Sequence, residues 1–328
     1  MDYTTLPKIE LHLHLDCSLS YEVVQQIAPS ISYETYRESF IAPPKCTDLA
    51  DYLTRATKGT ALMQTKAELR LVTLDLCRQL KKDHVIYAEI RFAPLLHLEK
   101  GLTPAEVVQT VNETATEGMA ETGITVGLIL CTLRHYTEAQ SMETVRLVAQ
   151  FNGTNVVGFD IAADEAGFPI DNHVSAFTFA KEKGLHVTAH AGEAKGAESV
   201  WETLKNFHPS RIGHGVRSVE DPTLMAFLKR EAIHLEVCPT SNVQTDVVAT
   251  IKDHPADRIY QSGVSMSVNT DARAISNTTL TREYQILRDE FDWKKAHFLK
   301  CNLEAIKHAF TSDAMKAALC AKIIEAYS

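Results

Sequence analysis

Two histidines and two acids alternate with apolar residues in IELHLHLD, residues 9–16. Successive side chains of a strand point to opposite faces, so the face opposite the leucines carries Glu10, His12, His14 and Asp16. Residues two apart lie about 6 to 7 Å from each other on that face, so both histidines can reach one metal ion. One histidine alone is more typical of a half-solvated strand, but the pair indicates a metal site completed by residues elsewhere.

Further polar residues stand where later apolar runs end. They are Asp160, His190 with Glu193, His214, and Asn269 with Asp271. In a barrel of parallel strands the carboxyl ends meet around one opening, where reactive groups lie. The predicted fold and the predicted site therefore support each other.

We assign four of these residues as metal ligands: His12, His14, His190 and Asp271. Three imidazoles and a carboxylate suit a divalent cation of borderline softness, and we expect one Zn²⁺ per chain, with iron, cobalt or manganese as alternatives. A bound cation of this kind lowers the pKa of its water, so that hydroxide becomes available near neutral pH.

Two more residues fit catalytic roles around that water. Glu193, three residues after a ligand in HAGE, is placed to act as general acid and base. His214, between two glycines in GHG, can approach closely and hold or polarise a metal-bound hydroxide.

Each assignment has a structural alternative. Taken singly, His190 or His214 is more typical of a hydrogen-bonded core histidine, and Asp271 could cap a following helix. Three other histidines near strand candidates have nothing beside them to complete a site, and we interpret them as structural: His97, His135 and His234.

Composition limits the classes of function. Lys plus Arg number 33 against 42 Asp plus Glu, without a basic cluster, which argues against nucleic-acid binding. The first residues lack a secretion signal and no apolar run approaches 18 residues, so we expect a cytoplasmic protein without membrane spans. The seven cysteines include no CxxC pair and are expected to be reduced thiols. Nothing indicates an obligate protein partner.

Eight short apolar or β-branched runs alternate with segments of helical periodicity, such as 104–122, which follows the cap Thr103, and 138–151. This alternation predicts an α/β fold, a (β/α)8 TIM barrel formed as one domain over residues 1–328. An open doubly wound sheet is the alternative, but it usually has a glycine-rich turn after its first strand, and none is present.

One connection is too long for a simple barrel. About residues 17–84, after the first strand, contain helix-like pieces at 48–58 and 66–82 behind a Pro43-Pro44 break. A helical insertion at this place would lie over the barrel mouth and could form a lid, or it could consist of extra packing helices.

The motifs LPKIELHLHLD, HAGE, RIGHGV, CPTSN and VNTD, in this order, resemble the adenosine deaminase family from Leu6 to about Tyr284. The resemblance implies a barrel with one catalytic zinc on the four ligands above. It also implies that Glu193 protonates purine N1 and that His214, with Asp271, assists attack of metal-bound hydroxide at C6. The products would be ammonia and inosine or 2′-deoxyinosine.

The resemblance also implies substrate contacts. Asp16 would hold the ribose 5′ hydroxyl, and Ala163 in the fourth strand would meet purine N3 through its backbone amide. Asp160, at the end of the same strand and facing the barrel opening, is a further candidate substrate contact. Three positions depart from the family pattern: Cys17 and Ala163 replace glycines, and Ala272 replaces an aspartate that bonds purine N7. Losing that contact costs about 1 to 3 kcal/mol if the partner stays unpaired. Water or Arg273 could fill the gap.

Cys17 is most simply a small replacement for glycine, although a thiol beside two ligands could bind metal or be oxidised. Ala163 and Ala272 leave a second hypothesis open, the same chemistry on a modified or N6-substituted adenine nucleoside or purine. A third is a catalytically silent barrel that binds a nucleoside or a partner. A silent site would be expected to have lost a ligand or the glutamate, and this sequence keeps both.

Overall fold

The computed structural model describes residues 3–328, and eight parallel strands run through them. Their bounds are β1 Lys8–His14, β2 Val85–Phe92, β3 Thr125–Leu133, β4 Val156–Ala162, β5 Thr188–Ala191, β6 Arg211–His214, β7 His234–Val237 and β8 Met266–Val268. The strands pair in chain order within two four-stranded sheets, β1 to β4 and β5 to β8.

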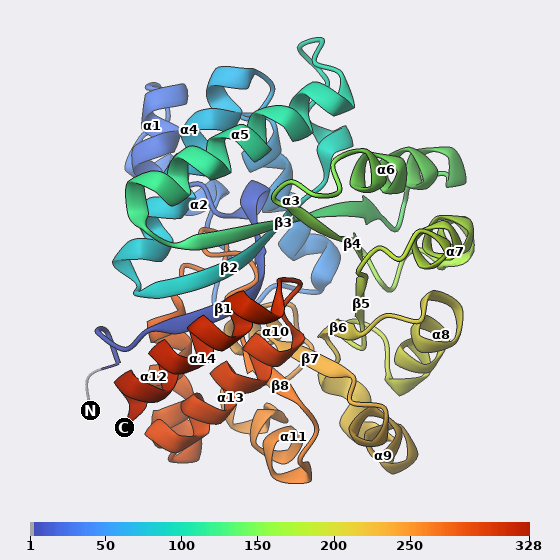
Figure 1. Cartoon of the computed structure of the whole chain (residues 1–328). Helices are drawn as coiled ribbons and strands as arrows, with labels where there is room; N and C mark the ends of the chain where they lie inside the picture. Colours follow the sequence, from blue (N-terminus) through green and yellow to red (C-terminus); the bar gives the residue numbers. More distant parts are fainter. Residues whose placement is uncertain (1–2) are drawn as a thin grey trace.

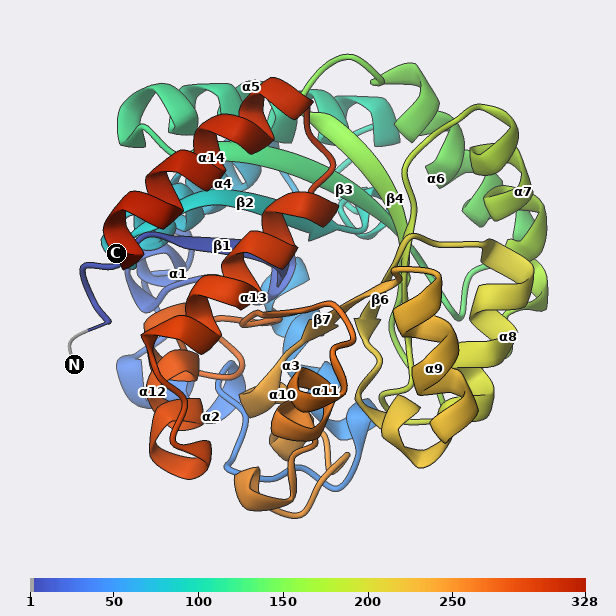
Figure 2. The same ribbon diagram turned by 60° about the horizontal axis from the view of Figure 1, so that its bottom comes forward.

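Isolated bridges join the two sheets at both seams. Phe159 in β4 pairs with Val187 just before β5, and Leu13 in β1 pairs with Asp271 just after β8. At the second seam the Asp271 amide donates to the carbonyl of His12 at 2.9 Å. The strands thus surround one axis (Figure 2), and the predicted TIM barrel is confirmed.

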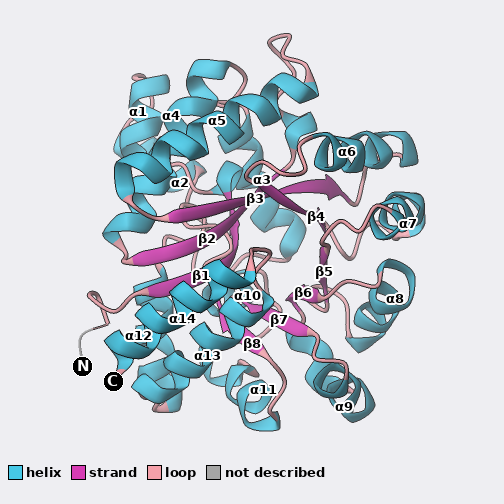
Figure 3. Cartoon of the chain, in the orientation of Figure 1, coloured by secondary structure: helices cyan, strands magenta, loops and turns pink. Residues whose placement is uncertain are grey.

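Helices form the outer layer around the strands (Figure 3). Those that follow strands β2 to β7 and close the ring are α5 Pro104–Thr122, α6 Glu138–Gln150, α7 Val174–Glu182, α8 Ala197–Phe207, α9 Pro222–Arg230, α10 Pro239–Gln244 and α11 Ala256–Ser262. After β8 come α12 Leu280–Phe291, α13 Lys295–His308 and α14 Asp313–Tyr327, and α13 packs against β1 and β8. The start of β1 and the C-terminal helix α14 lie on the same side of the molecule (Figure 1).

Local sequence explains the helix boundaries. At the start of α5, Thr103 accepts the amide of Glu106 and the Glu106 carboxylate accepts the amide of Thr103, which forms a capping box. Gly123 ends the same helix with φ of +73°, a conformation that costs glycine little. The helices predicted at 104–122 and 138–151 are therefore present as α5 and α6.

The long connection after β1 is helical. It contains the 3-10 helix η1 Leu15–Cys17 and then α1 Tyr21–Ile27, α2 Tyr33–Ser39, α3 Leu49–Thr60 and α4 Lys66–Lys82. Helix α4 packs along α5, whereas α3 packs against η1, directly beside the histidine-bearing end of β1. The residues described include no helix long and apolar enough to cross a membrane, and their seven cysteines are all free thiols.

Candidate metal centre and active site

Four predicted ligand atoms converge at the carboxyl end of the barrel. Nε2 of His14 lies 3.2 Å from Nε2 of His190. Oδ1 of Asp271 lies 3.3 Å from Nε2 of His12 and 3.5 Å from Nε2 of His14. Residues from β1, β5 and the end of β8 thus gather around one point, although up to 259 positions separate them in sequence.

His214 joins the same cluster from β6. The possible ligand atoms of His12, His190, His214 and Asp271 lie within 4.8 Å of one another. Five side chains therefore surround the point for which four ligands were predicted, and distance alone does not decide between His14 and His214 as a ligand.

Carboxylates behind the histidines direct their Nε2 atoms inward. Nδ1 of His12 lies 2.8 Å from Oε2 of Glu236, and Nδ1 of His190 lies 3.1 Å from Oδ2 of Asp160. Because a neutral imidazole bears one N–H, donation from Nδ1 leaves a lone pair on Nε2. Nε2 of His12 is buried and has no hydrogen-bond partner, as expected of an atom that faces a cation.

Asp160 takes a different place from the one expected. Its carboxylate is fully buried, contacts His190, and accepts a hydrogen bond from Arg91 at 2.8 Å. It lines neither cavity described below. The contacts of Asp160 are thus with His190 and Arg91, and its place as a substrate contact stays a prediction.

Glu236 and Arg91 complete this layer, and the sequence reasoning missed both. Arg91 bridges Glu236, at 2.7 Å, and Asp160. Although burial opposes charge on Glu236, Arg91, Arg211 and His12 hold its pKa well below the usual range. The sequence did offer a signal for both residues, because Arg91 and Glu236 are charged residues inside the apolar strand segments VIYAEIRFA and IHLEVCP.

Strained backbone marks the same site. His214 has φ of +59°, Asp271 +63° and Ala163 +78°, in the region that L residues rarely adopt. Gly213 is required next to His214, since a Cβ there would lie 2.9 Å from Cε1 of His12. The packed rings and strand ends hold these residues in an unfavourable conformation.

Glu193 lies beside the cluster on the loop after β5. The Glu165 carboxylate accepts the amides of Gly192 at 2.8 Å and Glu193 at 3.0 Å, which fixes this loop. Oε2 of Glu193 lies 3.6 Å from Nε2 of His214. Burial, with the nearby carboxylates of Asp271 and Glu165, raises the pKa of Glu193 well above its usual value.

Two adjoining cavities reach this cluster. The inner one, about 50 Å³, lies against His14, His190, Glu193, His214 and Asp271. The outer one, about 390 Å³, is mostly apolar, and its titratable lining residues are His14, Asp16, Cys17, His135 and Asp164. His135, which the sequence analysis interpreted as structural, lines this outer cavity.

The other two histidines interpreted as structural make hydrogen bonds with neighbouring protein groups. His97 bonds the carbonyl of Met63, and His234 bonds Ser265 and Ser267.

The sequence matches the family described as adenosine deaminase over residues 7–326. The chain belongs to the adenosine deaminase family. An adenosine deaminase of Enterococcus faecalis is 35% identical, covering 98% of this chain and 97% of that protein, and one of Clostridium acetobutylicum is 34% identical, covering 97% of each. The family resemblance predicted from the motifs is confirmed.

Several solved structures have the same fold as this chain. An adenine deaminase from Arthrobacter aurescens superposes with a TM-score of 0.90 at 27% identity, covering 98% of both chains. An amidohydrolase with bound Zn from Burkholderia ambifaria has a TM-score of 0.90 at 21% identity, covering 99% of this chain and 91% of that one. An N6-methyl-AMP deaminase from Arabidopsis thaliana has a TM-score of 0.86 at 23% identity, covering 98% and 97%.

The departures from the adenosine deaminase pattern lie on the cavities. Cys17 and Ala163 line both cavities, and Ala272 lines the inner one, packed in an apolar cluster with Leu49 and Tyr52 of α3. The Cys17 thiol donates to Oδ1 of Asp16 at 3.6 Å, and burial raises its pKa well above the usual value, so it remains a thiol. This supports the interpretation of Cys17 as a small packing residue.

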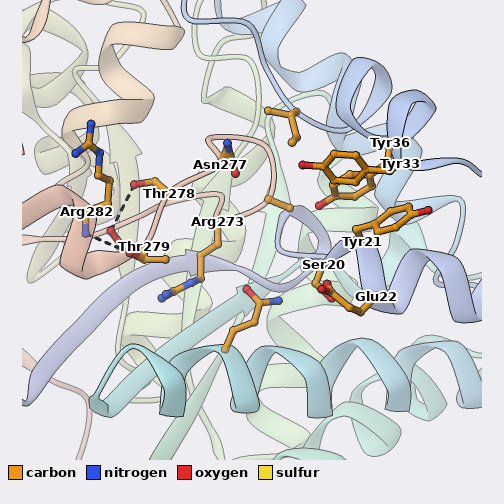
Figure 4. Close-up of a pocket in the computed structure, with 13 residues that line it drawn as sticks. Ser20, Tyr21, Glu22, Tyr33, Tyr36, Arg273, Asn277, Thr278, Thr279 and Arg282 are labelled. Carbon is orange, nitrogen blue, oxygen red and sulfur yellow. Dashed lines mark hydrogen bonds between the residues drawn. The ribbon is translucent and has the colours of Figure 1, made fainter. Parts of the chain in front are cut away.

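Arg273 does not approach the cluster. Its guanidinium binds Glu10 at 2.8 Å and Asp83 at 2.6 Å. It lines a separate pocket of about 360 Å³ beside Tyr21 and Tyr36, shown in Figure 4. The gap left at Ala272 is therefore not filled by Arg273.

Proposed function

We propose that this protein converts adenosine and 2′-deoxyadenosine, with water, to ammonia and inosine or 2′-deoxyinosine. The observation that carries the proposal is the convergence of His12, His14, His190 and Asp271 next to Glu193 and His214 at the end of one cavity. Membership of the adenosine deaminase family gives the reaction class its support.

One zinc ion per chain is our proposed cofactor, on His12, His14, His190 and Asp271. The donor set fits, because three imidazole nitrogens and a carboxylate are typical zinc ligands and the buried Nε2 of His12 makes no hydrogen bond. When bound, the ion would supply Lewis-acid activation of water near neutral pH.

The surrounding residues would move the protons. Glu193, buried at the cavity wall, would deliver a proton to purine N1, which makes C6 more electrophilic. His214 and Asp271 would hydrogen-bond the water that adds at C6. The C6–N bond then breaks and the amino group, after gaining a proton, leaves as ammonia.

The charge of the outer cavity favours a nucleoside over a nucleotide. Asp16 and Asp164 line it, and the described residues of both cavity linings include no lysine or arginine. A phosphate would meet like charge, which costs several kcal/mol at an interface. A neutral 5′ hydroxyl can instead donate to Asp16.

A second candidate substrate is an adenine nucleoside modified at N6 or elsewhere on the purine. Ala272 supports it, because an apolar wall of Ala272, Leu49 and Tyr52 replaces the carboxylate expected at purine N7. Burying an apolar substituent of the purine against this wall would contribute more binding free energy than burying the unsubstituted polar edge of the base.

The test measures formation of the 6-oxopurine product from a panel of adenosine, 2′-deoxyadenosine, N6-methyladenosine, adenine and AMP, because N6-methyladenosine would release methylamine and not ammonia. Metal content is measured by elemental analysis. We expect adenosine or 2′-deoxyadenosine to give the highest kcat/KM and AMP the lowest among the nucleosides and nucleotide. A higher value for N6-methyladenosine would favour the second candidate, and no turnover of any compound by metal-replete protein would reject deamination.

A further inference from the structure

A chain of buried hydrogen bonds runs from His214 away from the cavity. Nδ2 of Asn242, in α10, lies 3.1 Å from Nδ1 of His214. Oδ1 of Asn242 lies 3.2 Å from Nε2 of His254, whose Nδ1 accepts the amide of Ala256 at 3.1 Å. The three side chains are at most 3% exposed, so water does not compete for these contacts.

The direction of each hydrogen bond follows from the backbone amide at the far end. The amide of Ala256 can only donate, so Nδ1 of His254 accepts and its single N–H is on Nε2. That N–H donates to Oδ1 of Asn242, which leaves the Asn242 NH₂ group to face His214. Burial lowers the pKa of His254 to about 3, so the ring stays neutral near neutral pH.

Nδ1 of His214 must then accept a hydrogen bond, and the ring proton is on Nε2, which points toward Glu193. A histidine binds metal through a nitrogen lone pair, so an Nε2 that carries a proton is not a ligand. Among the described residues, His14 has no comparable donor at its Nδ1, which lies 4.0 Å from Oδ1 of Asp16, an acceptor.

We propose that Asn242 and His254 are positioning residues that hold the proton of His214 on Nε2 and so keep His214 a hydrogen-bond donor rather than a metal ligand. This inference rests on the proposed function, because the Nε2–H of His214 matters for catalysis only if it donates to the water that attacks purine C6. It also decides between the two possible ligand sets, because it leaves His14 as the third imidazole ligand.

The first experiment compares the ring nitrogen resonances of His214 by ¹⁵N NMR in metal-free wild-type protein and Asn242→Asp, with His214→Gln used for assignment. We expect a protonated Nε2 and an unprotonated Nδ1 in the wild type. Asn242→Asp replaces the donor with an acceptor of the same shape and should place a proton on Nδ1. A wild-type Nδ1–H, or an unchanged spectrum in the variant, overturns the proposal.

The second experiment measures kcat and bound zinc in the zinc-loaded variants. Asn242→Asp should lose roughly tenfold or more in kcat, less than the 10² to 10⁴ typical of losing an acid/base group, because the residue acts through His214. His254→Gln can still donate an N–H to Asn242 and should retain more activity than His254→Leu. Equal losses in those two variants would remove His254 from the proposal.

His234→Gln is the matched control, because His234 is a buried histidine bonded to Ser265 and Ser267 at the start of β7. It should leave the His214 resonances unchanged, and a shift there would show that any buried histidine substitution disturbs the ring. The NMR result requires no turnover. A protein with the expected tautomer but no deaminase activity would therefore reject the proposed function and keep the tautomer assignment.

Discussion

At the scale of single residues, Glu193 owes its position to its backbone. Glu165 fixes the loop by accepting two successive amides, and this leaves the Glu193 side chain free to face the inner cavity. The side-chain carboxylate of Glu193 accepts a long hydrogen bond from the Thr245 hydroxyl, at 3.4 Å. A carboxyl group that is rigidly placed but weakly bonded is suited to exchange protons with a ligand.

We therefore expect Glu193→Gln to retain bound metal and to lower kcat by at least a hundredfold, since acid/base groups contribute about 10² to 10⁴. Glutamine keeps the shape but cannot transfer the proton. Steady-state kinetics with elemental analysis checks this, with the exposed Glu202→Gln as control. Near-normal turnover would remove Glu193 from the mechanism.

Asp160→Asn distinguishes an orienting role from substrate binding. Because Asp160 contacts Nδ1 of His190 and lines no cavity, the variant should weaken metal affinity by about 10- to 100-fold, as loss of such a partner does. KM of the metal-saturated enzyme should change little. A chelator titration and kinetics at saturating zinc measure the two effects. Raised KM with unchanged metal affinity would contradict the orienting role.

Substitution of Ala163 by glycine tests whether the positive φ at this position strains the backbone beside the cavity. A positive φ costs an L residue about 1 to 2 kcal/mol, whereas glycine adds about 0.4 to 1 kcal/mol of unfolded-chain entropy. Ala163→Gly should therefore be neutral or slightly stabilising in thermal unfolding. Ala162→Gly, one residue earlier in β4, should destabilise, because it removes a buried methyl from ordinary strand backbone. Equal losses in both variants would show that Ala163 is unstrained.

At the scale of elements, α3 approaches the histidine-bearing end of β1 through one glycine. Gly59 is buried in α3, and a Cβ there would lie 2.5 Å from the carbonyl oxygen of Asp16. In an open helix, alanine would add about 0.5 to 1 kcal/mol of stability over glycine. Here the clash is with backbone, which cannot rotate away, so steric repulsion outweighs helix propensity.

We expect Gly59→Ala to lower thermal stability by about 1 to 3 kcal/mol, the usual cost of overpacking, and to raise KM, because α3 and Asp16 both line the outer cavity. Unfolding curves and kinetics measure the two effects. Lys58→Ala, an exposed change in the same helix, should do neither. Increased stability in Gly59→Ala would show that α3 can move away at no cost.

The sequence allowed prediction of elements whose signals are local. The capping box at Thr103 and the alternation in β1 depend on residues within a few positions. The roles of Asp160 and Asn242 could not be predicted, because each depends on a histidine from a different strand, 30 and 28 positions away. Periodicity contains no information about such partners. The histidines that we propose as ligands could be singled out only because their spacing and the family motifs coincide.

At the scale of the whole molecule, a polar interior connects distant strands. Arg211 binds Glu89 at 2.6 Å and Glu236 at 2.7 Å, which ties β6 to β2 and β7 across the barrel. Such buried pairs add little stability over apolar residues, but removal of one partner is costly. In this barrel the pairs fix the carboxylates that orient the histidines, so the interior couples folding to the geometry of the site.

Glu283 is a buried carboxyl without a countercharge in this interior. In α12 it accepts the Thr278 hydroxyl at 2.6 Å and the Thr240 amide at 3.1 Å, linking the segments after β7 and β8. Burial raises its pKa from 4.5 to about 7. The folded state thus binds this proton more tightly than the unfolded chain, and stability falls as the pH rises from about 4.5 to about 7.

The loss is about 3 kcal/mol for a shift of this size. Glu283→Gln is neutral at every pH and keeps one acceptor, so its stability should fall less, by about 2 to 3 kcal/mol, than that of the wild type between pH 5 and pH 8. Urea unfolding at the two pH values measures the difference, with the exposed Glu325→Gln as control. If the stabilities of wild type and Glu283→Gln change equally between pH 5 and pH 8, the Glu283 carboxyl ionises in the folded protein as readily as in the unfolded chain. That result would contradict the raised pKa of Glu283.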